Sequence, residues 1–238
     1  MIIAEKVIPA LDVQTEQELD FLLTELKGEA VTLKVGMELY YTFGNTIVQK
    51  IKDYGFNVFL DLKLHDIPNT VYRSTKTLSR LGVDILNVHA AGGIDMMKAA
   101  AEGFKEHNQS GLLIAVTQLT STSQEMLNQE LLIPGTTENI VLEYATNVKK
   151  SGLDGVVCSA LEVETLKREL GEGFKCITPG IRPKGESNSD QKRVMTPIKA
   201  IQTGSDYLVI GRAIYQANSP KEAFKNIIKE IESDLIKG

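Results

Sequence analysis

Charged side chains stand inside an apolar stretch of the sequence, "DLKLHDIPNT" at residues 61–70. The stretch follows the apolar run 58–60, so it begins within a predicted buried strand, and it carries Asp61, Lys63 and then Asp66. Burying an unpaired charge is costly, and such groups persist where they are paired or take part in chemistry. The stretch therefore predicts either a structural ion-pair network or a catalytic cluster.

The spacing of these charges predicts where they point. Asp61 and Lys63 are two residues apart in a strand, so they share one face, while the leucines between and beside them face the other way. Lys34, late in the preceding predicted strand, can join them. An Asp–Lys–Asp–Lys array would then alternate in sign. Each opposite charge favours the charged form of its neighbour, so the lysines stay protonated and the aspartates ionised.

Short apolar runs alternate with helical patterns along the whole chain. Eight runs read as strands covered on both faces: 7–13, 31–36, 57–64, 83–90, 112–119, 153–159, 175–181 and 206–211. Helix-start signals lie between them, including the capping pair Thr15 and Glu18, Ser219 before Pro220, and Thr196 before Pro197.

The alternation of eight strand patterns with helix patterns predicts an α/β protein. The predicted fold is a single (β/α)8 barrel (TIM barrel) that spans residues 1–238 as one catalytic domain. A doubly wound open sheet is the alternative. That fold usually carries a glycine-rich turn after its first strand, and the turn here, "LDVQTEQEL", contains no glycine.

Active sites of such barrels lie at the carboxyl ends of the strands. Besides the charged array, polar residues fall at or just after those ends: Asp12, His89, Thr120, Ser121, Arg182 and Arg212. Their convergence on one rim favours a functional site over a purely structural ion-pair network.

An anion site is predicted where the last strand ends. Gly211 lets backbone amides approach an anion and Arg212 supplies a forked cation, and barrels often hold phosphate beside their seventh and eighth strands. The loop 182–193 has the composition of a lid. Its side chains Lys184, Gln191, Lys192 and Arg193 either close over the anion or form a solvated basic loop.

The composition excludes several other classes. Hydrophobic residues make up 42% of the 238 residues, and a net charge of −5 argues against a broad nucleic-acid surface. The N-terminus lacks a signal-peptide layout and no apolar run approaches membrane-helix length, so a cytoplasmic protein is expected.

The cysteines and histidines give weaker signals. Cys158 and Cys176 are expected as buried free thiols rather than a disulfide or metal pair. His89 either lines the pocket or packs structurally, His65 falls past its strand end, and His107 is expected to be exposed. No spacing matches a metal site, so none is predicted.

The motifs together resemble the orotidine 5′-phosphate decarboxylase family. The resemblance rests on "DLKLHDIPNT" and, in family order over nearly the whole chain, on "ALDV" (10–13), "LKVGMELYY" (33–41), "NVHAAGG" (87–93), "VTQLTSTS" (116–123), "TPGIRP" (178–183) and "VIGRAI" (209–214). The D-x-K-x-x-D pattern alone also fits related phosphosugar decarboxylases and aldolases.

The resemblance implies a homodimeric carboxy-lyase that converts orotidine monophosphate (OMP) to uridine monophosphate (UMP) and carbon dioxide, the last step of de novo UMP biosynthesis. It implies no metal and no organic cofactor, with Lys63 as the proton donor. Lys34, Asp61, Lys63 and the other subunit's Asp66 would form a charged tetrad.

The resemblance also implies the binding residues. Asp12 and Lys34 would hold ribose hydroxyls, and Asp66 and Thr70 would reach the ribose of the other subunit's site. Thr120 would bond the pyrimidine, with Ser121 beside it. The phosphate would be bound or enclosed by Arg182, Gln191, Gly211 and Arg212.

Two other functions remain open on the residues alone. A metal-dependent phosphosugar decarboxylase or aldolase would share the barrel and the D-x-K-x-x-D pattern. A non-catalytic phosphate- or nucleotide-binding barrel is disfavoured, because an Asp–Lys–Asp–Lys cluster costs stability without a task.

Overall fold

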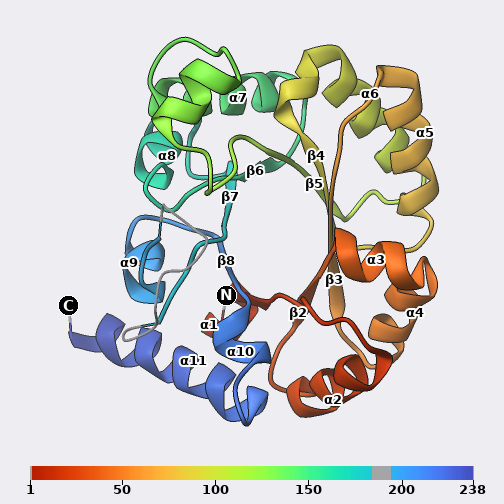
Figure 1. The fold of residues 1–238 in the computed structure, drawn as a ribbon, viewed down its shortest axis with the longest axis vertical. Helices are drawn as coiled ribbons and strands as arrows, with labels where there is room; N and C mark the ends of the chain where they lie inside the picture. Colours follow the sequence, from red (N-terminus) through yellow and green to blue (C-terminus); the bar gives the residue numbers. More distant parts are fainter. Residues whose placement is uncertain (1, 184–193, 238) are drawn as a thin grey trace.

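A ring of parallel strands forms the centre of the molecule (Figure 1). The computed structural model describes residues 2–183 and 194–237. The strands are β1 (Val7–Pro9), β2 (Thr32–Gly36), β3 (Asn57–Leu64), β4 (Ile85–His89), β5 (Leu112–Val116), β6 (Gly155–Val157), β7 (Lys175–Thr178) and β8 (Tyr207–Ile210). Each strand pairs with its sequence neighbour, and β8 pairs with β1. A bridge from Ala10 to Lys34, with Leu11 N donating to Lys34 O over 2.9 Å, joins β1 to β2 and completes the barrel.

Helices surround this ring (Figure 1). They are α1 (Ile3–Lys6), α2 (Glu16–Leu26), α3 (Met37–Phe43), α4 (Thr46–Asp53), α5 (Pro68–Ser79), α6 (Gly93–Lys105), α7 (Thr137–Lys150), α8 (Val163–Leu170), α9 (Pro197–Gln202), α10 (Arg212–Tyr215) and α11 (Pro220–Lys237). Single turns at Ala90–Gly92 and Met126–Glu130 complete the set. The α/β barrel prediction is confirmed, and the open sheet is excluded because β8 pairs with β1.

The predicted helix starts follow their capping chemistry. Thr15 and Glu18 make the reciprocal bonds of a capping box at α2. Ser219 Oγ accepts a hydrogen bond from Glu222 N at 3.3 Å, and α9 begins at Pro197 as predicted.

The core has two parts, one on each side of the sheet. Inside the barrel a compact cluster gathers Ile8, Ala10, Phe59, Ile85, Ile114, Val116, Val157, Ile177 and Val209. A larger cluster lies between the strands and the helices. Phe59 is 1% exposed, and burying such a side chain contributes about 1.5–3 kcal/mol. These side chains fill the middle of the barrel.

The aspartates of a repeated Gly-x-Asp pattern join neighbouring strands at the amino-terminal end of the barrel. It occurs just before three strands, at residues 82–84, 152–154 and 204–206. Each aspartate accepts a hydrogen bond from a backbone amide of the preceding strand: Asp84 from Val58 (2.8 Å), Asp154 from Leu113 (2.8 Å) and Asp206 from Cys176 (2.9 Å). These bonds tie β3 to β4, β5 to β6 and β7 to β8 at the end opposite the predicted site.

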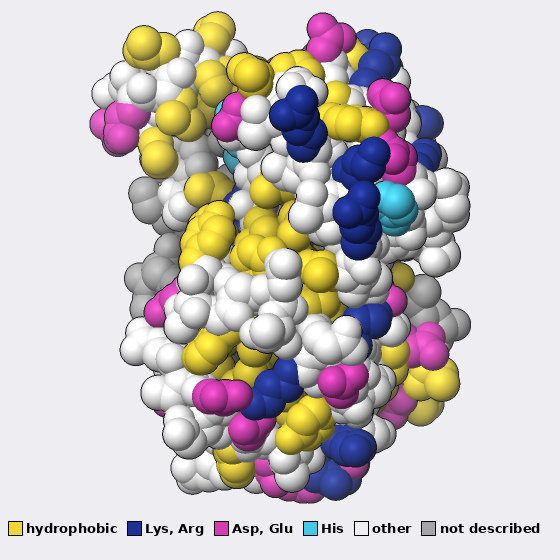
Figure 2. All heavy atoms as spheres, turned by 90° about the vertical axis from the view of Figure 1, so that its right-hand side faces the viewer, with side chains coloured by type: hydrophobic (Ala, Val, Ile, Leu, Met, Phe, Trp, Pro, Cys, Tyr) yellow, Lys and Arg dark blue, Asp and Glu magenta, His cyan; other side chains and the backbone are white. Residues whose placement is uncertain are grey.

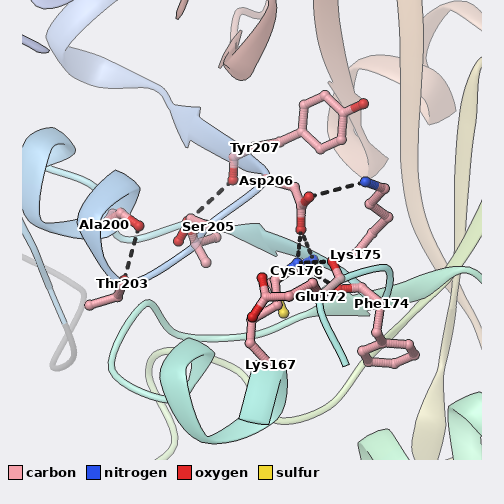
Figure 3. Close-up of polar contacts among 11 residues, drawn as sticks. Lys167, Glu172, Phe174, Lys175, Cys176, Ala200, Thr203, Ser205, Asp206 and Tyr207 are labelled. Atoms are coloured by element: carbon pink, nitrogen blue, oxygen red, sulfur yellow. Dashed lines mark hydrogen bonds and ion pairs between the residues drawn. The ribbon is translucent and has the colours of Figure 1, made fainter. Parts of the chain in front are cut away.

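Asp206 also holds two lysines (Figure 3). Its carboxylate lies 2.7 Å from Lys167 Nζ and 3.1 Å from Lys175 Nζ. The Lys167 side chain is 7% exposed, and its ammonium also donates to the carbonyl oxygens of Glu172 and Phe174. The three N–H donors of this buried ammonium therefore have three acceptors, so it is fully hydrogen-bonded.

The strands are shorter than the apolar runs that predicted them. β1 covers three of the predicted residues 7–13 and β6 three of 153–159. Apart from Ala10, which forms the bridge to Lys34, the remaining residues of both runs lie outside the strand pairing, and Asp12 and Cys158 among them line the site described below. Cys158 and Cys176 are both buried and neither forms a disulfide, as expected. Within the described residues, no helix has the length and apolarity needed to cross a membrane.

Candidate active site

A cavity of about 460 Å³ opens at the carboxyl ends of the strands. Its lining includes most of the residues predicted from the sequence, namely Asp12, Lys34, Asp61, Lys63, Thr120, Ser121, Arg182, Gly211 and Arg212. They arrive from six of the eight strands or the loops that follow them. The barrel topology alone explains this convergence, since parallel strands all end on the same rim.

The charges alternate in sign across the cavity floor. Lys34 Nζ lies 3.4 Å from Asp12 Oδ1 and 3.5 Å from Asp61 Oδ2. Lys63 Nζ lies closer, 2.7 Å from Asp61 Oδ1. Lys34 and Asp61 are 11% and 13% exposed in their side chains, so solvent screens this row weakly.

The two neighbouring lysines keep Asp61 ionised. Burial raises the pKa of Asp61, but Lys34, Lys63 and the hydrogen bonds from Lys63 and Asn87 outweigh it, so the pKa of that carboxyl lies below 3.8. The carboxylate therefore holds a negative charge against Lys63 at neutral pH.

Asn87 is a site residue that sequence reasoning missed. Its side-chain oxygen accepts from Lys63 N at 2.7 Å, and its nitrogen donates to Asp61 Oδ1 at 2.6 Å. It is fully buried on β4. Strand parity offered a signal, because Ile85 and Asn87 share a face and Ile85 packs inside the barrel.

The pattern of charges and leucines on β3 follows the prediction. Asp61 and Lys63 line the cavity, whereas Leu60 and Leu62 join the core between the sheet and the helices. The strand is not regular, however. Lys63 has a φ of 53°, and the β3–β4 register shifts between Leu60 and Leu64.

Arg182 and Arg212 also line the cavity, as the anion-site prediction requires. Gly211 is the last residue before α10, and Arg212 is the first residue of that helix. Gln191, with Lys184, Lys192 and Arg193, lies outside the described residues, so the expectation for that part of the loop 182–193 stays a prediction.

Asp66 and Thr70 do not line this cavity. Both lie in the exposed segment 65–70. Thr70 instead lines a second, more open hollow of about 480 Å³, beside Tyr41 and Leu64. Figure 2 views the side of the molecule that carries α3 to α6 and shows hydrophobic side chains gathered there.

None of the three histidines is among the residues that line the cavity. The rings of His65 and His89 stack with centroids 5.5 Å apart. Burial, then His65 and Lys63, lower the pKa of His89 from 6.5, so its ring is neutral at pH 7. His65 lies past the end of β3 and His107 is exposed, as predicted.

Further lining residues were not predicted as site residues from the sequence, notably Gln118, Cys158 and Tyr215. A polar or apolar residue within or beside a strand-like run carries no local sequence signal that it will line a cavity. Over residues 2–183 and 194–237, no three His, Cys, Asp or Glu side chains gather as metal ligands would.

The chain is similar in sequence and in fold to known proteins. A Bacillus cereus (strain Q1) protein named orotidine 5′-phosphate decarboxylase is 48% identical over 233 residues, which cover 96% of this chain and 98% of that protein. The crystal structure of orotidine 5′-phosphate decarboxylase from Lactobacillus acidophilus has a TM-score of 0.85 at 40% identity, over 95% of this chain and 99% of that one. An uncharacterized conserved protein from Geobacillus kaustophilus has a TM-score of 0.84 at 45% identity, over 94% and 99% of the two chains.

Residues 5–227 match the profile described as "Orotidine 5′-phosphate decarboxylase / HUMPS family". That match spans most of the barrel, from α1 into α11. The chain belongs to the orotidine 5′-phosphate decarboxylase / HUMPS family.

Proposed function

We propose that the chain is a carboxy-lyase that converts OMP to UMP and carbon dioxide in pyrimidine biosynthesis. The observation that carries the proposal is the Lys63 ammonium, held 2.7 Å from Asp61 in a cavity that Arg182 and Arg212 also line. The curated relatives that share almost the full length carry the decarboxylase name.

The chemistry explains why the site presents an ammonium. Loss of carbon dioxide from C6 of the pyrimidine leaves an electron pair in an sp² orbital that the ring cannot readily delocalise. A fixed positive charge at that position stabilises the developing carbanion, and such preorganised electrostatics are usually the largest catalytic contribution. Lys63 then transfers a proton to C6, which completes UMP.

Lysine suits this role better than arginine. The high pKa of a guanidinium makes it a poor acid, whereas an ammonium donates its proton more readily. Asp61 and Lys34 hold Lys63 in place and keep the row of charges alternating. The distances of 2.7 Å from Lys63 to Asp61 and 3.5 Å from Lys34 to Asp61 support these positioning roles.

The rest of the cavity suits a nucleotide. Asp12 and Lys34 are proposed to bind ribose hydroxyls, and Thr120, with Ser121 beside it, to bind the pyrimidine. The phosphate is assigned to Arg182, Gln191, Gly211 and Arg212. Phosphate binding far from C6 contributes to catalysis when its energy orders the loop 182–193 and the site.

The proposed reaction needs no metal and no organic cofactor, because Lys63 supplies both the positive charge and the proton. We propose that the (β/α)8 barrel forms one catalytic domain. We also propose that the protein acts in the cytoplasm, where pyrimidine nucleotides are made.

We further propose a homodimer in which Asp66 and Thr70 of each subunit reach the other subunit's cavity. Asp66 and Thr70 are exposed and stand outside the cavity of their own chain. Tyr41 and Ile67 nearby are 70% and 66% exposed, which is unusual for large apolar side chains without a covering surface. In the dimer, Asp66 completes the tetrad near the substrate carboxylate, where its repulsion favours carboxylate loss.

An absorbance assay tests the function. Purified protein is mixed with OMP in excess EDTA, and the loss of orotate absorbance is followed. A rate that the chelator does not change supports the proposal. Absence of turnover by folded protein would instead direct attention to phosphosugar substrates with added magnesium, the metal-dependent chemistry of related barrels.

A further inference from the structure

The backbone of the proposed proton donor adopts a conformation that side-chain-bearing residues rarely occupy. Lys63 has a φ of 53°, in the left-handed region. For a residue with a Cβ this conformation costs about 1–2 kcal/mol, and it persists where surrounding contacts enforce it. Those contacts are therefore the ones that place Lys63.

The β3–β4 ladder does not supply the contacts that hold Lys63 in this conformation. Leu60 pairs with Leu86 and Leu64 pairs with Val88, so residues 61–63 on β3 stand opposite Asn87 alone on β4. Such a bulge leaves the extra residues without regular ladder partners on β4 and bends the strand, although Asp61 still pairs with Gly36 of β2 on the other side. Asp61 and Lys63 both lie in this bulge.

The Asn87 side chain fills the gap in the ladder. Its Oδ1 accepts from Lys63 N at 2.7 Å, and its Nδ2 donates to Asp61 Oδ1 at 2.6 Å. The same Asp61 oxygen receives the Lys63 ammonium at 2.7 Å. One fully buried amide thus binds the backbone of the lysine and the carboxylate that pairs with its side chain.

The orientation of this amide is fixed by chemistry. A backbone N–H only donates and an ionised carboxylate only accepts, so the oxygen of Asn87 must face Lys63 N and its nitrogen must face Asp61. Rotating the amide by half a turn would break both bonds. An ionised aspartate, which has no donor, or a leucine, which has neither donor nor acceptor, cannot make both bonds.

We infer that Asn87 is a positioning residue for the decarboxylation, which fixes the Lys63 ammonium by holding its backbone in the bulge and orienting Asp61 beside it. The inference rests on the proposed function of the same site. Asn87 acts through Lys63 and Asp61, and it does not line the cavity itself.

The chain contains a matched control. Asn108, which is half-buried, makes a similar pair of bonds below the opposite end of β4: its Oδ1 accepts from Gly111 N at 2.8 Å and its Nδ2 donates to a backbone carbonyl, Val83 O, at 2.6 Å. Substituting Asn108 removes two comparable hydrogen bonds but leaves Lys63 untouched.

The test compares Asn87→Leu and Asn87→Asp with Asn108→Leu. Leucine keeps the size of asparagine without hydrogen bonds, and aspartate accepts but does not donate when ionised. We expect both Asn87 variants to lose about 100-fold in kcat with KM for OMP and affinity for UMP nearly unchanged, because small misplacements of a reacting group cost this much. We expect Asn108→Leu to lose stability and keep its kcat.

Either of two results would overturn the inference. One is a folded Asn87 variant whose kcat stays within about twofold of wild type, since that change is under 0.5 kcal/mol. The other is a crystal structure of Asn87→Leu, or of Asn87→Asp should the leucine variant not fold, in which Lys63 keeps its positive φ and its contact with Asp61. The structure is decisive even if the wild-type chain does not turn over OMP, which would refute the proposed function separately.

Discussion

Lys63 Nζ lies 2.7 Å from Asp61 Oδ1, while Lys34 Nζ lies 3.5 Å from the other oxygen of the same carboxylate. One buried aspartate thus holds two ammonium groups with its two oxygens. Lys63 is the more exposed of the two lysines, at 26% of its side chain against 11% for Lys34. Both lysines line the cavity, and the Asp61 carboxylate between them holds each ammonium in place.

Lys63→Ala is expected to lower kcat by roughly 10³-fold or more, because it removes both the positive charge and the proton. The absorbance assay with OMP measures this, and circular dichroism checks the fold. Lys52→Ala is the control, since Lys52 forms an ion pair with Asp84 at the other end of the barrel (3.0 Å). A loss of only about tenfold, roughly 1.4 kcal/mol, contradicts the proton-donor role.

Arg212→Ala is expected to weaken UMP binding by roughly 10- to 100-fold, the usual worth of a hydrogen bond to a charged group. Affinity for uridine, which lacks the phosphate, should stay the same. Isothermal titration calorimetry with both ligands separates the two effects. If the substitution leaves UMP affinity unchanged, Arg212 does not bind the phosphate.

Asp61→Asn is expected to destabilise the fold at neutral pH and progressively less in acid. The folded-state pKa of Asp61 lies below its ordinary value of 3.8, so the unfolded chain binds the proton first as the pH falls. The stabilising contribution is therefore complete above that value and is lost as the pH falls through the folded-state pKa. Urea unfolding of both proteins at a series of pH values measures this, and a difference that stays constant into acid would disprove it.

Mixing two inactive variants tests the shared site. If Asp66 acts in the other subunit's cavity, Lys63→Ala and Asp66→Ala chains form heterodimers with one site free of both changes. Random mixing then restores about a quarter of wild-type activity, because half the dimers are mixed and half their sites are intact. The chains are refolded together and assayed. No recovery from a mixture shown to contain heterodimers would place Asp66 in its own chain's site or in none.

The amino-terminal aspartates are expected to affect stability without affecting kcat. Asp154→Ala removes one charged acceptor from Leu113 N and should cost about 1–3 kcal/mol. Asp206→Ala also leaves the buried Lys167 ammonium without its carboxylate, so we expect about 3–5 kcal/mol. Urea denaturation gives both values, and equal losses in the two variants would show that the lysine pairing adds nothing.

The sequence by itself determined the barrel and most of the cavity lining. Strand identity depends on local apolar runs, and parallel strands bring their carboxyl ends to one rim whatever their exact bounds. That is why Asp12, Lys34 and Arg212, far apart in the chain, could be placed together from sequence and are found lining one cavity.

The tertiary structure decided how neighbouring strands meet. The bulge at residues 61–63, the positive φ of Lys63 and the two bonds of Asn87 depend on the β3–β4 register. The backbone bonds of Asp84, Asp154 and Asp206 likewise join one strand to the next. Register depends on which side chains pack against one another across neighbouring strands, and those side chains are distant in sequence.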